Sequence, residues 1–597
     1  MEGEHSTKRG LSDRFVDFLF SNDLKKHLLW IVPLGFLLRV LMANSITPLG
    51  DEMIHAPRAI GFLHSGLLST ILQAPVWLYL TDIVYSLMGV SLLSSRFLSV
   101  FFGSLTIIMI YLLAVKIFNK KVAVISSLSL AMSFFTIRYS LAEMDLAATF
   151  FLVVALYSLI IDSEKKKYPY LSAICIGIAA LIKTLSLFFV PAFFVAILFY
   201  NGGLKKKLLW ANTKKIILFG LIILAIYSPI LIHNYLWYQD KGMVDTYFAQ
   251  YFFPSLRENY AGQLGYSNDV AHFLPKFFQG VHSVSSEIFK LDPLIISLGI
   301  IGLLLSFMIN KDKRNYWWIL VAYFFSGFIL LILSNWLQTH YTTLMPVLAI
   351  FCGYALVFIG EKIGLLINKK RVLTIIVLAL IISQLFMLWP YVTSRGGLSG
   401  LRSYASDSID KNSIVVVDSR VYRGRVAWAF NDFHYLEASL FPQLMQLNQN
   451  LSGGQKVPTK IYFVECAIDD CGWGTVGAGE LNDSSEALVS LFASQGKLEK
   501  SITGGYNAEE RPGQVIFKVY SAVVDMDPRI ILSVDSTHTW FYYPMNYIPK
   551  EQIYDNYEVN GLFNSLLYGS AWVILIASII ASMVLIAYPF YHVYRSD

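Results

Sequence analysis

The chain has 597 residues, of which 55% are hydrophobic and only 15% are charged. Soluble domains carry about a quarter charged residues, so this composition excludes a purely soluble protein and indicates a polytopic membrane protein. The net charge of +6 is modest, and the positions of the lysines are more informative than their number. Residues 1–26 are polar and lack the apolar core of a cleavable signal.

Twelve apolar stretches are long enough to cross a bilayer, which takes roughly 17–25 residues. They lie near residues 27–43, 96–117, 122–140, 145–162, 168–183, 184–200, 216–233, 292–309, 316–334, 341–359, 372–389 and 566–592. A further stretch near 75–92 carries Asp82 in its middle, which is typical of a helix that lies in the membrane interface. The sequence therefore predicts a polytopic α-helical membrane protein of about 12 transmembrane helices.

Lysine and arginine in short loops mark the cytoplasmic side of a membrane protein. The basic clusters share one side only if the stretch 75–92 does not cross the bilayer. These clusters are Lys8/Arg9/Arg14/Lys25/Lys26, Lys116/Lys120/Lys121, Lys165–Lys167, Lys205–Lys207 with Lys214/Lys215, Lys311/Lys313/Arg314 and Lys369/Lys370/Arg371. We therefore expect both termini to be cytoplasmic.

This topology divides the chain into four parts. We expect a cytoplasmic segment at 1–26, a transmembrane catalytic domain at 27–390, an extracytoplasmic domain at 391–565, and a final transmembrane helix with a short tail at 566–597. Several charged segments then share the outer face. They are the loop with Asp51 and Glu52, the turn Arg138–Asp145, Lys183, the loop 234–291 and the turn Ser334–His340.

The region 391–565 has the composition of a small soluble α/β domain. Residues 413–418 and 460–465 are predicted buried strands, and 514–523 alternate as a strand with one exposed face. Segments 425–448 and 484–496 are predicted helices. Cys466 and Cys471 lie close together and could pair if this region is outside the cell, whereas Cys175 and Cys352 are expected to be buried thiols. The glycosylation sequons at Asn450 and Asn482 support the outside placement only weakly.

Two pairs of carboxylates are the leading catalytic candidates. Asp51 and Glu52 follow the first span, and Glu143 and Asp145 precede the fourth. If the spans form a bundle, both pairs can meet in one pocket at the membrane surface, where a carboxylate can act as general base toward a hydroxyl group. The alternatives are a solvated acidic loop for the first pair and helix capping for the second.

Candidate cations surround these carboxylates in the predicted topology. A lysine at the middle of a membrane helix costs about 2.5–3.5 kcal/mol, so Lys183 is expected at the outer boundary, where it could bind a phosphate. Further candidates are Arg58, Arg96, Arg138, His55, His340 and Tyr341. Arg96 could equally be a snorkelling residue at a span end, and His340 and Tyr341 could be ordinary interface residues. The charges of the loop 234–291 match no metal-binding signature.

The residues resemble the membrane-embedded GT-C glycosyltransferases, in the branch that contains protein O-mannosyltransferases and the lipid A aminoarabinose transferase. The resemblance covers roughly Val32 to Val357. It rests on the order of Arg39, Asp51-Glu52-Met-Ile-His55-Ala56, Gln73-Ala-Pro75-Val-Trp-Leu-Tyr79, Arg96, Arg138–Asp145, Lys183, Pro229–Tyr235 and His340-Tyr341 before Pro346. The chain departs from the family pattern at His55, where the family has tyrosine, and at Gln73-Ala74, where it has a basic residue or histidine. It lacks the WWD-type signature of oligosaccharyltransferases.

The resemblance implies that a sugar is transferred from a polyprenyl (dolichyl or undecaprenyl) phosphate to an acceptor hydroxyl outside the cytoplasm, with inversion. It implies Asp51 as general base, with Glu52 in support. Asp145 and Glu143 would orient the sugar or acceptor, or hold a divalent metal if one is used. Lys183, Arg138 and Arg96 would stabilise the leaving phosphate. The acceptor could be protein, lipid or glycan, and no nucleic acid is expected as a partner.

Two other classes of protein share part of this pattern. Twelve spans with buried charges also describe many secondary transporters, but those usually contain internal repeats, and none is visible here. An inactive scaffold that keeps the fold is the second alternative. The retained Asp51 and Asp145 favour an enzyme over a scaffold.

Overall fold

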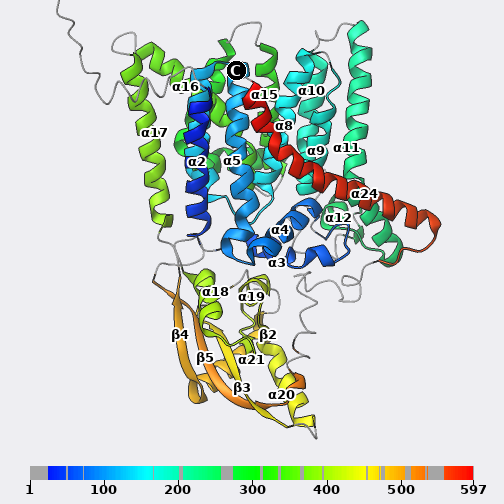
Figure 1. Cartoon of the computed structure of the whole chain (residues 1–597), viewed down its shortest axis with the longest axis vertical. Coiled ribbons are helices and arrows are strands. Elements are labelled where there is room, and N and C mark those ends of the chain that lie inside the picture. The colour runs from blue at the N-terminus through cyan, green and yellow to red at the C-terminus, as the bar shows by residue number, and fades with distance from the viewer. Residues whose placement is uncertain are drawn as a thin grey trace, which may run out of the picture.

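The computed structural model of the chain is a bundle of helices with a sheet-containing unit at one end (Figure 1). It describes residues 24–46, 48, 51–71, 73–165, 167–200, 206–253, 255–256, 273–308, 314–333, 338–363, 369–392, 396–421, 423–451, 455–468, 471, 478–504, 513–530, 534 and 557–595. Most of the predicted cytoplasmic segment 1–26 and parts of the loops 234–291 and 334–340 lie outside these residues. So does Ser452 of the first sequon.

Each of the twelve predicted apolar stretches overlaps a helix of the bundle, although four of these helices have only 11–13 residues. These helices are α2 (Leu24–Ala43), α5 (Leu92–Ile117), α6 (Lys120–Met132), α8 (Asp145–Glu164), α9 (Tyr170–Ile182), α10 (Val190–Tyr200), α11 (Lys206–Lys241), α14 (Pro293–Leu305), α15 (Arg314–Leu333), α16 (Met345–Ile363), α17 (Lys369–Val392) and α24 (Leu562–Val584). Within the described residues, eight helices are long and apolar enough to cross a membrane alone. A ninth span forms if α13 (Phe273–Leu291) and α14 are one crossing bent by 119°.

Shorter helices connect and end these spans. They are α3 (Glu52–Arg58), η1 (Phe62–His64), α4 (Pro75–Met88), α7 (Phe134–Arg138), η2 (Thr184–Phe189), α12 (Thr246–Tyr251), η5 (Ser306–Met308), η7 (Gln338–Thr343), η10 (Leu585–Ala587) and α25 (Tyr588–Arg595). The predicted interfacial stretch 75–92 contains α4, which lies with α3 across the end of the bundle nearest the sheet (Figure 1). Proline at its first position suits a helix start, and Gly89 ends it with a φ of 70°.

Small residues allow three helices to approach closely at the core of the bundle. A Cβ atom on Gly302 of α14 would lie 1.9 Å from the carbonyl oxygen of Phe351 in α16. A Cβ atom on Gly353 of α16 would lie 2.2 Å from Oγ of Ser126 in α6. Close backbone contact of this kind is the usual way in which membrane helices associate. Helices α6, α14 and α16 therefore form a tightly fixed group.

The sheet-containing unit has five strands in the order β2-β1-β3-β5-β4. Strands β1 (Ile414–Val417), β2 (His434–Glu437) and β3 (Val457–Cys466) are parallel, whereas β4 (Lys497–Thr503) and β5 (Val515–Met526) pair antiparallel. Its helices are α18 (Gly397–Ser408), α19 (Arg423–Ala429), η8 (Ala438–Leu440), α20 (Phe441–Asn450) and α21 (Ala478–Gln495).

The secondary structure of this unit agrees with the prediction at β1, β3, β5 and α21. The single helix predicted at 425–448 is wrong, because β2 separates α19 from α20 in this segment. The four residues of β2 are too few to show an alternating pattern, and parallel pairing with β1 selects the strand.

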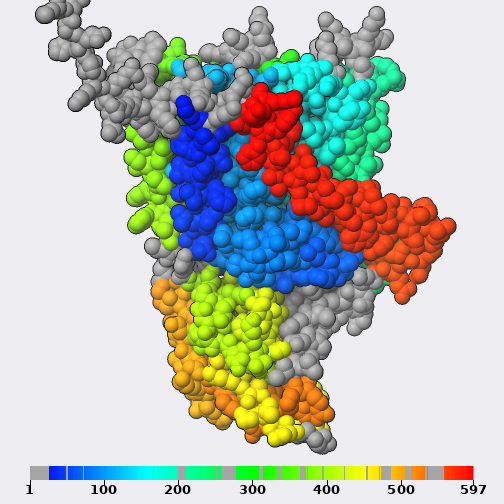
Figure 2. All heavy atoms as spheres, viewed as in Figure 1, coloured from blue at the N-terminus to red at the C-terminus, as the bar shows by residue number. Residues whose placement is uncertain are grey.

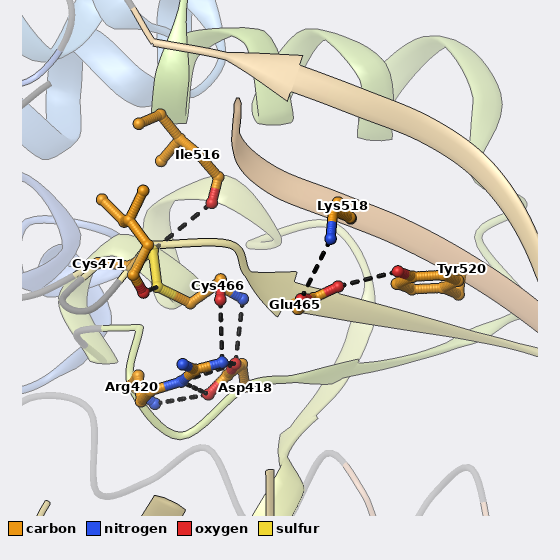
Figure 3. A network of polar contacts seen from close by, with 9 residues as sticks. Asp418, Arg420, Glu465, Cys466, Cys471, Ile516, Lys518 and Tyr520 are labelled. Carbon is orange, nitrogen blue, oxygen red and sulfur yellow. Dashed lines mark hydrogen bonds and ion pairs between the residues drawn. A yellow bond between two sulfur atoms is a disulfide. The ribbon is translucent and has the colours of Figure 1, made fainter. Parts of the chain in front are cut away.

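A polar network fixes the turn that joins β1 to α19 (Figure 3). The carboxylate of Asp418 accepts hydrogen bonds from the backbone amides of Arg420 and Cys466 and forms an ion pair with the Arg420 guanidinium. Cys466 and Cys471 form a disulfide, so the two cysteines that could pair by sequence do so. In α19, Nη1 of Arg425 donates to the Cys471 carbonyl at 3.0 Å. Helix α19 is thus rigidly attached to the sheet.

The unit packs against the end of the bundle through α18 and α19. Figure 2 shows the yellow-green surface of this unit in direct contact with the blue surface of the α3 and α4 region. One buried cluster combines Met53 and Ala56 of α3 with Val426 and Trp428 of α19. The sheet unit and α3 therefore share one hydrophobic core.

Candidate active site

Asp51 occupies the position just before the first residue of α3. Its backbone is helical, with φ −63° and ψ −11°, and its side chain makes no capping hydrogen bond. A capping aspartate normally has an extended backbone that turns its carboxylate toward the helix amides. The carboxylate of Asp51 is therefore not used to cap α3 and remains available to a substrate.

The neighbouring Glu52 is completely buried in an ion pair with Arg96 of α5. Nε and Nη2 of Arg96 donate to the two carboxylate oxygens of Glu52 at 2.5 and 2.8 Å. Nη1 of the same guanidinium donates at 2.7 Å to the carbonyls of Ala43 and Ile46, at the end of α2. Arg96 thus joins α2, α3 and α5 and fixes the residue next to Asp51.

Asp145 and Lys183 form a second ion pair at the same end of the bundle. Asp145 is the first residue of α8, and Lys183 has an extended backbone that separates α9 from η2. Nζ of Lys183 lies 2.5 Å from Oδ2 of Asp145, and their side chains are 12% and 4% exposed. The break between the two short helices therefore turns the lysine toward the carboxylates.

Electrostatics connect Asp51 to this second pair. Burial raises the pKa of Asp51, Lys183 and Arg58 lower it, and Asp145 raises it further. Glu143 lies in the loop before α8, where burial and then the charges of Asp51 and Asp145 raise its pKa well above the usual value. Three carboxyl groups therefore crowd around one lysine, and Glu143 keeps its proton more readily than an ordinary glutamate does.

Two histidines of the predicted site are also close to Lys183. Burial, then the charges of Arg58 and Lys183, hold the pKa of His55 well below its usual value. Burial and the charge of Lys183 lower the pKa of His340 to about 3. Both imidazoles are therefore neutral at physiological pH. The His55 ring lies edge-on to Trp77 of α4, with 6.3 Å between the ring centroids.

The structure does not bring every predicted residue into this cluster. The guanidinium of Arg138 lies over the rings of Phe134, Tyr139 and Tyr391, at 5.9, 5.3 and 4.8 Å from their centroids. The predicted contact of Arg96 with a phosphate also differs from what is seen, since its donors bind Glu52 and two carbonyls. Tyr341 is buried, and its hydroxyl has no hydrogen-bond partner among the described residues.

A metal ion has no ready-made position in the described part of the chain. No group of three or more histidine, cysteine, aspartate or glutamate side chains is arranged there to hold one. Lys183 instead supplies a positive charge next to Asp145.

Comparison with known proteins shows what the chain is similar to. Residues 72–233 match the family described as dolichyl-phosphate-mannose-protein mannosyltransferase, and this stretch contains Arg96, Asp145 and Lys183. The structure is similar to ArnT from Cupriavidus metallidurans bound to undecaprenyl phosphate, with a TM-score of 0.51, 11% identity and coverage of 83% of this chain and 97% of that one. The chain therefore has a fold similar to that of the GT-C glycosyltransferases.

The matched segment is thus similar to protein mannosyltransferases, and the overall fold is similar to that of ArnT. The GT-C fold is also shared with the apo oligosaccharyltransferase of Archaeoglobus fulgidus, with a TM-score of 0.50, 15% identity and coverage of 83% of this chain and 81% of that one. No curated protein sequence matches the chain. The predicted resemblance is confirmed, and the protein is an integral, multi-pass membrane protein.

Sequence reasoning missed a buried polar network beside the cluster. Gln73 and Ala74, which precede α4, both have positive φ, 62° and 63°, a conformation that is costly for residues other than glycine. Nε2 of Gln73 donates to Asp245 at 2.8 Å, and Asn234 of α11 bonds both the carboxylate and the amide of Asp245. This network holds the segment between α3 and α4 in its strained form. The sequence features that could have indicated this network are Asn234 and the unusual Gln73-Ala74 before Pro75.

Proposed function

We propose that this chain is a glycosyltransferase that moves a sugar from a polyprenyl phosphate to a hydroxyl acceptor, with inversion at the anomeric carbon. The observation that carries the proposal is the uncapped carboxylate of Asp51 beside the Asp145–Lys183 ion pair. This arrangement provides a base and a cation at one place in a poorly hydrated site, as the reaction requires.

The proposed reaction is a single displacement. The acceptor oxygen attacks the anomeric carbon and forms the new glycosidic bond while its proton passes to the carboxylate of Asp51. The bond from the anomeric carbon to the phosphate oxygen breaks, and its electron pair leaves with the polyprenyl phosphate. Attack from the face opposite the leaving group inverts the anomeric configuration.

The leaving phosphate needs positive charge, and Lys183 is the best-placed cation for it. Its ammonium group is held by Asp145 at 2.5 Å and retains two further protons for a phosphate oxygen. Arg58 adds positive charge at the same place, because the charges of Arg58 and Lys183 both lower the pKa of Asp51. We assign Arg96 and Glu52 to the positioning of α3, and Glu143 and His340 to hydrogen bonds with the sugar or acceptor.

Three observations support an extracytoplasmic site. The disulfide Cys466–Cys471 belongs to an oxidising compartment, and the unit that contains it packs directly on α3, next to Asp51. The predicted basic clusters, such as Lys116 and Lys120, lie at the opposite ends of their helices. We therefore place Asp51 and the region 391–565 outside the cytoplasm, and both termini inside.

The donor class is supported by the ArnT structure, which is described as bound to undecaprenyl phosphate. The test is to incubate purified protein with a panel of undecaprenyl- and dolichyl-phosphate sugars and follow release of the lipid phosphate and transfer to protein, lipid and glycan acceptors. Release that requires an acceptor and fails in Asp51→Asn supports the proposal. Wild-type protein that transports a sugar or ion without releasing lipid phosphate would establish the transporter alternative, and protein inert with every donor would favour a scaffold. Addition of EDTA or Mn²⁺ in the same assay decides whether a divalent ion takes part.

A further inference from the structure

A hydrogen bond joins the sheet unit to α5, next to α3. Nε1 of Trp428 in α19 donates to Oγ of Ser95 in α5 at 3.1 Å. Trp428 is 1% exposed and Ser95 is also 1% exposed, so this bond is made in a dry interior. An indole N–H that is buried in this way normally needs a partner, and here the partner belongs to the transmembrane bundle.

Ser95 is the centre of a short chain of bonds that ends on α3. Its Oγ donates to the Ser91 carbonyl at 2.7 Å. The hydroxyl of Tyr85 in α4 lies 2.9 Å from the same Oγ and 3.1 Å from the carbonyl oxygen of Ala56 in α3. Ser95 also directly precedes Arg96, which binds Glu52. Two residues therefore connect Trp428 to each end of α3: Ser95 and Tyr85 to Ala56, and Ser95 and Arg96 to Glu52.

Hydrogen bonds to the sheet unit hold α19, and with it Trp428, in a fixed position. The turn before α19 is fixed by Asp418, and α19 is tied by Arg425 to the carbonyl of Cys471 in the disulfide loop. At the other end of α19, Arg402 donates to the carbonyls of Ala429 and Val90. The second of these bonds also crosses from the sheet unit to the bundle, beside the start of α5.

We propose that Trp428 is a positioning residue, through which the sheet unit sets the place of α3 and thereby of Asp51 relative to Lys183. The inference rests on the proposed role of Asp51 as base. A part of the chain that is far from the charged cluster in sequence would thus control the geometry of the reaction. Misplacement of a reacting group by about 1 Å can lower a rate a hundred-fold, so a small change at Trp428 is enough to matter.

The first experiment measures the position of α3 without any substrate. Trp428→Phe removes the indole donor, and Ser95→Ala removes the acceptor with little change of volume. Hydrogen–deuterium exchange of the full-length protein in nanodiscs should show amides of residues 52–59 exchanging about five-fold faster in either variant, the factor expected for one neutral hydrogen bond. The control is Tyr520→Phe, which removes the 2.9 Å bond to Glu465 in the same sheet unit (Figure 3). Tyr520 belongs to a buried cluster that contains no residue of α3. The control variant should leave the exchange of residues 52–59 unchanged.

The second experiment measures transfer by the same proteins. After correction for the folded fraction, kcat should fall between about ten-fold and a hundred-fold in Trp428→Phe with the KM for the lipid donor unchanged. The acidic limb of the pH profile should shift, because Asp51 moves relative to Lys183, Asp145, Arg58 and Glu143. If Trp428→Phe only reduced the amount of active protein, the rate would fall by the same factor at every pH. The double variant should be no worse than Ser95→Ala alone.

The two experiments separate the inference from the proposed function. Unchanged exchange of residues 52–59 in both single variants overturns the inference, whatever the transfer assay shows. Faster exchange combined with unchanged kcat and pH profile also overturns it. A wild-type protein with no transfer from any donor overturns the proposed function, and with it the assignment of Trp428 to catalysis. Faster exchange with a lower kcat and a shifted pH profile supports both.

Discussion

Glu52 and Arg96 form an ion pair whose side chains are both 0% exposed, with Nε of the arginine 2.5 Å from Oε1 of the glutamate. Removal of one partner from a buried pair leaves an uncompensated charge, which costs about 3–5 kcal/mol. We expect Arg96→Met to lower thermal stability strongly. Arg96→Lys should also fail, because one ammonium cannot reproduce both the two-point contact with Glu52 and the bonds to Ala43 and Ile46. Unfolding in detergent monitored by fluorescence measures both effects, and a Lys variant as stable as wild type would contradict this reading.

Asp51 is the residue whose loss should affect chemistry alone. Asp51→Asn keeps the shape of the side chain and removes no capping bond, so the melting temperature should change little. Loss of a general base lowers kcat by about a hundred-fold to ten-thousand-fold. The matched control is the exposed Asp407→Asn in α18, which should transfer sugar at the wild-type rate. Transfer by Asp51→Asn at more than a tenth of the wild-type rate would remove Asp51 as the base.

Removal of Lys183 alone should destabilise the protein, and additional removal of the Asp145 charge should restore stability but not activity. Lys183→Met leaves the carboxylate of Asp145, which is 4% exposed, without its partner, and we expect a loss of about 3–5 kcal/mol. The double variant Lys183→Met/Asp145→Asn should recover most of that stability, since neither member of the ion pair is left as an unpaired charge. Its transfer activity should stay low because the phosphate has lost its cation. Recovery of activity in the double variant would show that Lys183 has only a structural role.

The pH dependence of transfer should follow the charges around Asp51. Burial raises the pKa of Asp51 above its ordinary value near 3.8, and a base works only when it is deprotonated, so kcat/KM should fall as the pH drops through this raised pKa. Lys183 lowers this pKa and Asp145 raises it. Lys183→Gln should therefore move the acidic limb to higher pH, and Asp145→Asn should move it to lower pH. Shifts in the same direction for both variants would contradict the proposed arrangement.

The disulfide should be present in protein isolated from membranes. Digestion without reduction should yield the peptides of Cys466 and Cys471 linked to each other, whereas Cys175 and Cys352 should be found as free thiols. Replacement of both linked cysteines by serine should lower stability by about 2 kcal/mol, the value for so short a loop in the chain-entropy account. Reduced cysteines in freshly isolated membranes would place the sheet unit in a reducing compartment and contradict the proposed topology.

The sequence predicted the candidate site where charged residues occur next to apolar spans. Asp51, Asp145 and Lys183 stand out because charges at the ends of apolar spans are costly, and the positive-inside rule places all three on one face. The structure brings them together as one cluster. The apolar stretches could be located for the same reason, since the bilayer imposes a minimum length on every span.

The pairing of the charges could not be predicted in this way. Glu52 follows Asp51 directly, yet the backbone of α3 directs Glu52 to Arg96 and leaves Asp51 beside Lys183. Which neighbour faces which partner depends on the rotation of a seven-residue helix, and its sequence has no apolar periodicity long enough to fix that rotation. The contact of Trp428 with Ser95 joins residues 333 positions apart and depends on how two folded units fit together.

The close contact of Gly302 and Gly353 with neighbouring helices restricts how a long lipid could approach this protein from the bilayer. Any side chain larger than hydrogen would collide there, so the close contact of α14, α16 and α6 leaves no space between them for an isoprenoid tail. The polyprenyl chain of the proposed donor should therefore reach the charged cluster along another flank of the bundle. Helix α11 has exposed Ile217, Leu221 and Leu224 on its outer face, and spectroscopic probes placed there should sense the donor lipid, whereas probes beside Gly302 should not.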